Sequence, residues 1–306
     1  MIKKLGGSYQ VYDHEAEVPQ SKDEKRLWAF KYNWYPEVQP YGDTPLLGLN
    51  SADPINMGKN IRIAKYAGID VFICSWWGPG HYTDDRFRAM LDVAQSEGFT
   101  ICPYLELWDG ESPRSQDTIG QWIDYVFRKY ITHKAFAQIN GEPALWFFAS
   151  GGYTNEQWQE MTSRFSGGTF IADSADVNCL NIFNGMHDYG VVGYTNPEKR
   201  FKAQQLAVNL FAADYRCPYF FSPITIPGFE RNDKKGGILP RNDGDTYEKF
   251  WNAAIGADPH DIVIVTWDEF AENSHIAPSK NYGMKYVNMT RRFSQQWKGK
   301  NDSTNH

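Results

Sequence analysis

Two glutamates near the end of the chain have the residue type and the spacing that acid–base chemistry requires. Glu269 and Glu272 stand three residues apart and follow the apolar run 262–265. If the chain leaves a strand there and turns at 270–271, the i to i+3 spacing brings both side chains to one side. Two carboxyls in different surroundings can then divide the roles of acid and base, one kept protonated and the other ionised. A solvated acidic loop is the alternative, and the fold around the pair distinguishes the two interpretations.

The elements that must position this pair alternate along the whole chain. Apolar runs of strand length are followed by longer segments of helical period, with short connections between them. Strands are predicted at 27–35, 70–77, 100–108, 144–150, 169–173, 190–194, 219–226 and 261–267. Helices are predicted at 54–67, 83–97, 116–132, 155–165, 197–214, 246–255 and 282–297. Such alternation requires parallel strands with crossover helices, and about eight repeats favour an α/β fold of the (β/α)8 TIM barrel type.

The domain organisation follows from the same pattern. We predict a single barrel domain over 1–306, with an N-terminal extension at about 1–25 and a frayed polar tail at 298–306. The polar segment 136–143 is interpreted as a turn before a strand, and no domain linker is predicted. An open dinucleotide-binding sheet is the weaker alternative, because Tyr-Asn-Trp-Tyr at 32–35 stands where that fold needs a glycine-rich phosphate loop.

Rings and carboxylates gather where the predicted strands end, which is where a (β/α)8 barrel forms its active site. In strand order they are Tyr32, Trp34 and Tyr35; Trp76 and Trp77; Glu106 and Trp108; Asp173; Tyr194; Phe229; and finally Glu269 and Glu272. Aromatic faces beside carboxylates suit a sugar, because the C–H face of a pyranose packs on a ring while carboxylates bind hydroxyls and move protons. Any single tryptophan could simply fill the rim, but five or six rings together favour an oligosaccharide or polysaccharide ligand.

Composition and motif spacing exclude several other classes. With 31 basic and 37 acidic side chains the net charge is −6, so a nucleic-acid partner is not expected. No stretch reaches the roughly 18 to 20 apolar residues of a membrane span, and the N-terminus shows no apolar signal-peptide segment, so no compartment is predicted. The four cysteines stand apart and the histidines form no HxH or HExxH motif, so we predict neither a metal nor a cofactor.

Several motifs resemble glycoside hydrolase family 99, the endo-alpha-mannosidases and their barrel-shaped relatives. The aromatic run 30–35 resembles the family's first strand, Ser-Ala-Asp-Pro at 51–54 its first helix start, and 67–77 its second strand. Leu-Glu at 105–106 and Pro-Gly-Phe at 227–229 are similar to its third and seventh strand ends. Most specific is Trp-Asp-Glu-Phe-Ala-Glu at 267–272, which resembles the family's N-E-W-x-E-G motif. Four nearby positions depart from the family pattern, namely Asp268, Phe270, Asn273 and Ala277.

The resemblance implies a retaining, endo-acting hydrolysis of alpha-mannosides through a 1,2-anhydro sugar intermediate, without a cofactor. By the same resemblance Glu269 is the base that assists the sugar's 2-hydroxyl, and Glu272 is the general acid and then the base. Tyr194 is implied to contact the reacting sugar, Glu106 to contact substrate, and Trp76 or Trp77 to form a subsite wall.

Two other hypotheses remain open from the residues themselves. The barrel could bind carbohydrate without cleaving it, or it could be a glycosidase of the same fold with a different sugar specificity. A conventional two-carboxylate mechanism that pairs Glu272 with Glu106 belongs to the second hypothesis. The sequence predicts no oligomeric state.

Overall fold

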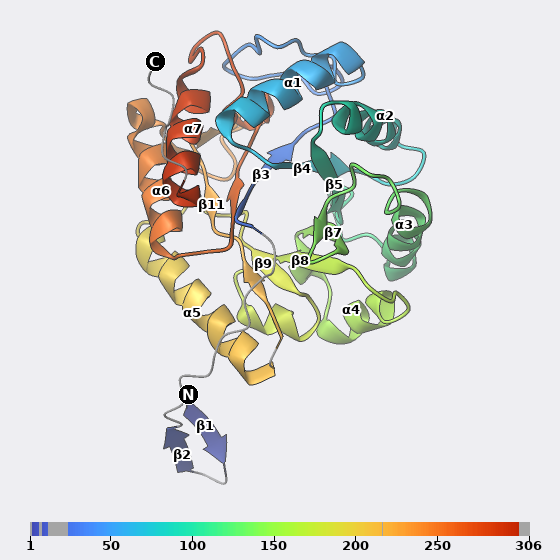
Figure 1. Ribbon diagram of the computed structural model, residues 1–306, viewed down its shortest axis with the longest axis vertical. Helices are drawn as coiled ribbons and strands as arrows, with labels where there is room; N and C mark the ends of the chain where they lie inside the picture. The colour runs from blue at the N-terminus through green and yellow to red at the C-terminus, as the bar shows by residue number, and fades with distance from the viewer. Residues whose placement is uncertain (1, 6–7, 12–23, 216, 300–306) are drawn as a thin grey trace.

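The barrel is closed by parallel strand pairing around the whole ring. The computed structural model describes residues 2–5, 8–11, 24–215 and 217–299. In ring order the strands are β3 (Arg26–Lys31), β4 (Val71–Trp76), β5 (Thr100–Glu106), β7 (Glu142–Phe148), β8 (Thr169–Asp173), β9 (Gly185–His187), β10 (Phe220–Phe221) with β11 (Ile224–Thr225), and β14 (Asp261–Ile264). β10 pairs with β9, β11 with β14, and β14 with β3, so the predicted TIM barrel is confirmed (Figure 1).

The predicted seventh strand is present as two short pieces. Ser222 donates its N–H to the carbonyl of Met186 on one neighbour, and Pro223 accepts from the N–H of Val263 on the other. Proline has no N–H to give to a ladder, so pairing with both neighbours along one continuous strand is interrupted here. The strand therefore closes the ring by pairing with one neighbour before the proline and with the other after it.

Seven helices surround the strands within the described residues (Figure 1). They are α1 (Pro54–Ala67), α2 (Tyr82–Ser96), α3 (Gln116–Lys129), α4 (Asn155–Thr162), α5 (Pro197–Tyr215), α6 (Asp245–Gly256) and α7 (Lys285–Lys298). The first shows why their ends were predictable: the Asp53 side chain accepts from the N–H of Ile55, Pro54 opens the helix, and Gly68 closes it at φ 85°. The predicted helices are confirmed within three residues, with the largest shifts at the ends of α3 and α4 and at the start of α7.

Short elements complete the chain. They are the antiparallel pairs β1 (Ile2–Leu5) with β2 (Ser8–Val11) and β12 (Phe229–Glu230) with β13 (Ile238–Leu239), β6 (Gln138–Ile139) on the edge of β7, and 3-10 turns at Ser150–Gly152, Val177–Asn181, Asn242–Gly244 and Phe270–Glu272. The expected N-terminal extension lies partly outside the described residues, at 12–23, as does most of the expected tail, at 300–306. Helix α7 reaches Lys298, so the described start of that tail is helical.

The predicted sixth strand at 190–194 is wrong. The strand is β9 (Gly185–His187), and 190–194 forms irregular backbone beyond its end. Gly185, Met186 and His187 lack the β-branched pattern that marks a strand, whereas Val191 and Val192 carry it. Burial against both neighbouring strands overrides that local preference, because every residue of β9 is buried.

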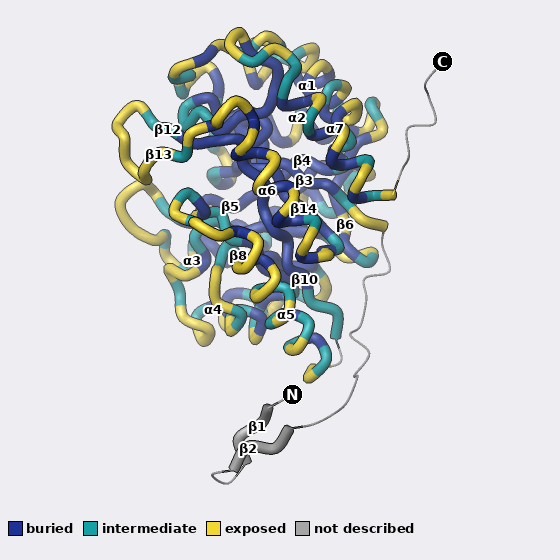
Figure 2. The backbone as a smooth tube through the Cα atoms, turned by 90° about the vertical axis from the view of Figure 1, so that its left-hand side faces the viewer, coloured by how far each residue is buried: buried dark blue, intermediate teal, exposed yellow. Residues whose placement is uncertain are grey.

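The strands are buried along most of their length (Figure 2), and many of the large aromatic residues are fully buried. Trp28 packs on Trp146 with ring centroids 5.3 Å apart, and Phe30 packs on Tyr104 at 4.5 Å. These rings face one another inside the strands, so they are core and not ligand surface. In the part of the chain that the structure describes, no helix is long and apolar enough to cross a membrane.

Candidate active site

The loop after β14 presents Glu269 and Glu272 at the C-terminal rim of the barrel. The chain turns through the 3-10 segment Phe270–Glu272, which ends at Asn273 in the left-handed region with φ 47°. The N–H of Glu269 donates to the hydroxyl of Thr266 at 2.8 Å, which fixes the start of the turn. The predicted turn is therefore confirmed, and the two carboxyls lie close enough that each affects the pKa of the other.

Their shared burial controls the protonation of this pair. Burial raises the pKa of Glu269 well above its usual range, and the charge of Glu272 raises it further. Burial also raises the pKa of Glu272, while the neighbouring Arg231 guanidinium, 3.2 Å away, opposes that rise. Both carboxyls therefore keep a proton to higher pH than a free glutamate does, which suits groups that transfer protons near neutral pH.

A tyrosine that the sequence analysis missed contacts the pair. The hydroxyl of Tyr189 donates to Glu269 Oε2 at 2.9 Å, and the hydroxyl of Tyr32 lies 2.7 Å from that of Tyr189. Trp34 stacks on Tyr32 with ring centroids 4.4 Å apart. Tyr189 follows β9 by two residues, so a correct sixth strand would have identified it. The predicted Tyr194 instead hydrogen-bonds to Asp188, away from the pair.

Glu106 is the third carboxyl of the rim. It ends β5, and the hydroxyl of Ser75 donates to its Oε1 at 2.6 Å. Burial raises its pKa to about 7, an effect that the Ser75 hydrogen bond and the charge of Arg114 reduce. The Trp77 indole N–H also donates to Ser75, at 3.1 Å. Half-buried Trp77 therefore lies at the rim beside Glu106, as predicted.

Asp173 links two strand ends beside the same site. Its carboxylate accepts the backbone N–H of Tyr189 at 2.9 Å and that of Ala149 at 3.0 Å. Burial raises its pKa to about 6, while these two hydrogen bonds favour its ionised form. Asp173 thus orients the backbone of Tyr189, whose hydroxyl contacts Glu269.

Several predicted substrate-binding residues have other positions. Trp76 has no exposed surface and donates its indole N–H to Asp84, so it is core. Tyr35 is buried behind the pair. Phe229 is buried in β12, and Trp108 is half-buried after β5, close to Gly152. Strand alternation explains the split between Trp76 and Trp77, because neighbouring side chains point to opposite faces.

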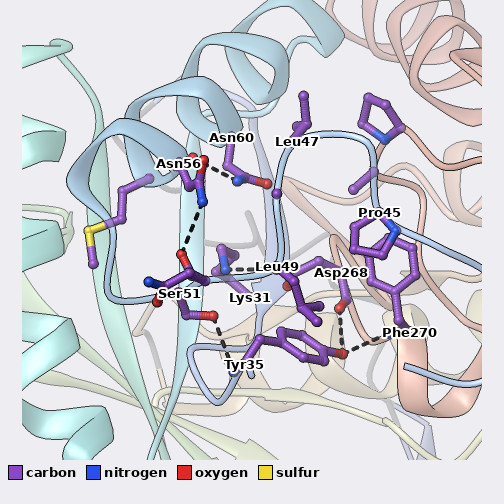
Figure 3. Close-up of a pocket in the computed structure, with 15 residues that line it drawn as sticks. Lys31, Tyr35, Pro45, Leu47, Leu49, Ser51, Asn56, Asn60, Asp268 and Phe270 are labelled. Atoms are coloured by element: carbon purple, nitrogen blue, oxygen red, sulfur yellow. Dashed lines mark hydrogen bonds and ion pairs between the residues drawn. The ribbon is translucent and has the colours of Figure 1, made fainter. Parts of the chain in front are cut away.

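Asp268 and Tyr35 support the loop from behind. Lys31 Nζ lies 2.7 Å from Asp268 Oδ2, and both side chains are buried. The Tyr35 hydroxyl donates to the Asp268 carbonyl and accepts from the N–H of Phe270 (Figure 3). These residues line a pocket with Asn56 and Ser51 of the α1 side, and neither glutamate of the pair is part of its lining. The pocket is therefore behind the acid–base pair and separate from it.

The described residues contain no group of three or more His, Cys, Asp or Glu side chains that could hold a metal ion.

Comparison with known proteins places this fold and this motif in one family. The sequence profile of glycosyl hydrolase family 99 matches residues 30–293. The chain belongs to this family. It is 22% identical over 311 residues to a mouse glycoprotein endo-alpha-1,2-mannosidase-like protein, covering 87% of this chain and 65% of the relative. A Xenopus laevis glycoprotein endo-alpha-1,2-mannosidase is also 22% identical, with 87% and 66% covered. The chain thus spans about 65% of the length of the curated relatives it matches first.

A solved family 99 structure agrees with the barrel over nearly its whole length. It is the endo-alpha-mannosidase from Bacteroides thetaiotaomicron, with a TM-score of 0.77, 23% identity, and 90% of this chain and 97% of that chain covered. A protein described as glycoside hydrolase-like also matches, with a TM-score of 0.66 and 12% identity, covering 92% of this chain and 97% of that chain. At these identities the likeness shows that the family 99 fold is shared.

Proposed function

We propose that this family 99 protein is a retaining, endo-acting glycoside hydrolase that cleaves alpha-mannoside-like linkages through a 1,2-anhydro sugar intermediate. The observation that carries the proposal is the close pair Glu269 and Glu272 at the barrel rim, with the pKa of both carboxyls raised by burial. The printed activities of the relatives, endo-alpha-mannosidases, favour a mannose-containing glycan as substrate.

The first step needs a base at the 2-hydroxyl and an acid at the glycosidic oxygen, which lie on opposite faces of the sugar ring because the 2-oxygen attacks C1 from behind the leaving group. The carboxylate of Glu269 takes the proton of the 2-hydroxyl, whose oxygen attacks C1 and forms the three-membered ring. Glu272 donates its proton to the glycosidic oxygen as the C1–O bond breaks, so the leaving sugar departs with a hydroxyl. Tyr189 supports the ionised form of Glu269 by donating to its Oε2.

The second step reverses the proton transfers. The carboxylate of Glu272 removes a proton from water, whose oxygen attacks C1 and opens the ring. The 2-oxygen recovers its proton from Glu269, and both glutamates return to their starting states. Two inversions at C1 give overall retention.

The protonation state of the free enzyme differs from the one that the first step needs, so substrate binding must change it. Burial and the charge of Glu272 favour the proton on Glu269, whereas the reaction starts with the proton on Glu272. The proton must therefore pass from Glu269 to Glu272 before the first step. The Arg231 guanidinium beside Glu272 opposes it, so a sugar placed between Glu272 and Arg231 would ease the transfer.

Methylation of the substrate's 2-hydroxyl tests this mechanism. We expect an alpha-mannan oligosaccharide to be cleaved with retention at C1, and the same compound methylated at the 2-oxygen of the reacting sugar to resist cleavage. The Glu272→Gln variant should bind the unmethylated glycan without turnover. Full activity of that variant would contradict the roles proposed here, and binding without any product from wild type would favour a non-catalytic barrel.

The second candidate is a glycosidase with a conventional double-displacement mechanism, and the environment of Glu106 favours it. Glu106 is a buried rim carboxyl whose pKa lies at about 7, a value suited to an acid–base group near neutral pH. Cleavage of the methylated substrate at an undiminished rate would support Glu106 as the partner of Glu272, because that route does not use the 2-hydroxyl.

A further inference from the structure

A second surface on the same rim lies apart from the acid–base pair. It is an open groove between the segment after β5 and the segment after β7. Its lining includes Pro113, Arg114 and Gln116 from the first segment and Gly152, Tyr153 and Gln157 from the second. We call this surface the β5–β7 groove. Figure 1 shows the helices that follow it, α3 and α4, on the opposite side of the barrel from α6 and α7.

The groove combines a ring with neutral hydrogen-bonding groups. The Tyr153 hydroxyl donates to the carbonyl of Arg114 at 2.7 Å, which holds the half-buried ring in the groove wall. Gln116 and Gln157 bring amide groups from the first turns of their helices. Gly152 keeps the floor open, since a Cβ there would meet Pro113 at 3.3 Å.

The charge of the lining favours a neutral ligand over an anion. The lining contains one carboxylate, Asp117, and one cation, Arg114. The Arg114 guanidinium donates to the carbonyls of Glu106 and Trp108 at 3.1 and 3.3 Å. The same guanidinium lies over the ring of Trp122, 4.9 Å from its centroid. Because these contacts already occupy the guanidinium, the groove suits hydroxyl groups more than phosphate or carboxylate.

Arg114 also joins the groove to the reacting centre. It lies 5.7 Å from the centroid of Trp77, and its charge acts on the pKa of Glu106. From Glu106 the path across the barrel mouth leads to Glu272, whose charge in turn acts on Glu106. A glycan chain lying over these residues would connect the pair to the groove.

The direction of that chain follows from the role of the acid. In the proposed mechanism Glu272 protonates the oxygen of the leaving sugar, so the leaving part lies beside Glu272 and Arg231, which follows β12. In ring order β7 lies four positions from β14, on the opposite side of the barrel. Sugar units attached to the non-reducing side of the reacting sugar therefore point toward the groove.

We propose that the β5–β7 groove is a distal subsite that binds neutral sugar units on the non-reducing side of the cleaved bond, beyond Trp77. This inference rests on the proposed glycosidase function. A glycan with several sugar units on the non-reducing side of the cleaved bond is therefore a better substrate than one with a single unit there.

Two glutamine-to-tryptophan variants on one helix test the subsite. Gln116→Trp places an indole in the groove, whereas Gln121→Trp places the same group at an exposed position of α3 that is not part of the lining. The substrates are alpha-linked mannose oligosaccharides with one labelled leaving sugar and either one or several mannose units on the non-reducing side. The measurement is kcat/KM for each, with thermal melting of each variant and the milder Gln116→Ala as safeguards against misfolding.

We expect wild type to prefer the long substrate, and Gln116→Trp to lower kcat/KM for it by about tenfold while leaving the short substrate unaffected. Gln121→Trp should match wild type on both. An equal effect of Gln116→Trp on both substrates, or none on either, overturns the subsite while the proposed function stands. Absence of cleavage of either substrate by wild type overturns the proposed function and the subsite with it.

Discussion

The loop after β14 has two faces with different surroundings for a buried carboxyl: a second carboxyl on one face and a lysine on the other. Toward the barrel mouth it presents Glu269 and Glu272, two like groups whose pKa values are both raised. Toward the protein it presents Asp268, which is paired with Lys31 at 2.7 Å. We call these the mouth face and the rear face. The side chain of Asp268 is held by an opposite charge, whereas its neighbour Glu269 has a like charge beside it.

The rear face carries a second buried pair of side chains. His275 Nε2 lies 3.0 Å from Asp43 Oδ2, and its ring stacks on Phe270 at 3.9 Å. Burial lowers the pKa of His275 to about 4, so the ring is neutral near pH 7. A rigid rear face can hold the mouth face in a state that is unfavourable for stability and useful for proton transfer. The comparison predicts that substitutions on the two faces have opposite consequences.

The largest effect is expected from Glu269→Gln on the mouth face. Loss of the proposed base should lower kcat by about a thousandfold. The same change should raise the free energy of unfolding near pH 8. A carboxyl whose pKa is higher in the folded protein than in the unfolded chain destabilises the fold once the pH exceeds its unfolded pKa, and glutamine removes that effect. Single-turnover kinetics and thermal melting measure the two effects. A variant that is both inactive and less stable than wild type at pH 8 would contradict the contrast.

On the rear face, Lys31→Met should destabilise the fold by about 3 kcal/mol, because it leaves Asp268 as a buried, unpaired carboxylate. The double variant Lys31→Met with Asp268→Asn removes both charges and should be destabilised less than the sum of the two single variants. Urea unfolding of the four proteins gives this coupling. Strict additivity would show that the ion pair does not support the loop.

Glu106→Gln tests the mouth face through pH. Burial raises the pKa of Glu106 from 4.5 to about 7, so the folded protein holds this proton more tightly than the unfolded chain. The contribution of Glu106 to stability is therefore lost as pH rises from about 4.5 to about 7. The variant should match wild type near pH 4 and exceed its stability by about 3 kcal/mol at pH 8. Melting curves at both pH values decide, and a constant difference would argue against this titration.

Tyr189→Phe should have the smallest effect of the four, a loss of about tenfold in kcat. Without the hydroxyl, the pKa of Glu269 rises further, so the acidic limb of the kcat profile should move to higher pH. Tyr194→Phe is the matched control, because its hydroxyl contacts Asp188. If both variants shift the profile equally, Tyr189 has no special role.

The sequence pattern was most informative where local and tertiary preferences agree. Helix α1 has an Asp53 cap, Pro54 at its start and Gly68 at its end, and each acts locally. The spacing of Glu269 and Glu272 is likewise local, because one turn brings both side chains together. The sixth strand was mispredicted because Gly185, Met186 and His187 become a strand only by burial between neighbours.

By itself the sequence determined the alternation of strands and helices, the motif at 267–272 and the close spacing of its two glutamates. These depend on period, capping and short-range turns, which are properties of neighbouring residues. Only the tertiary structure decided that Tyr189 contacts Glu269, that Trp77 lies at the rim while Trp76 is core, and that Lys31 neutralises Asp268. Each of the two polar contacts joins residues from different strand ends, and the tryptophans differ by which face of one strand they occupy, so closure of the barrel creates all three arrangements.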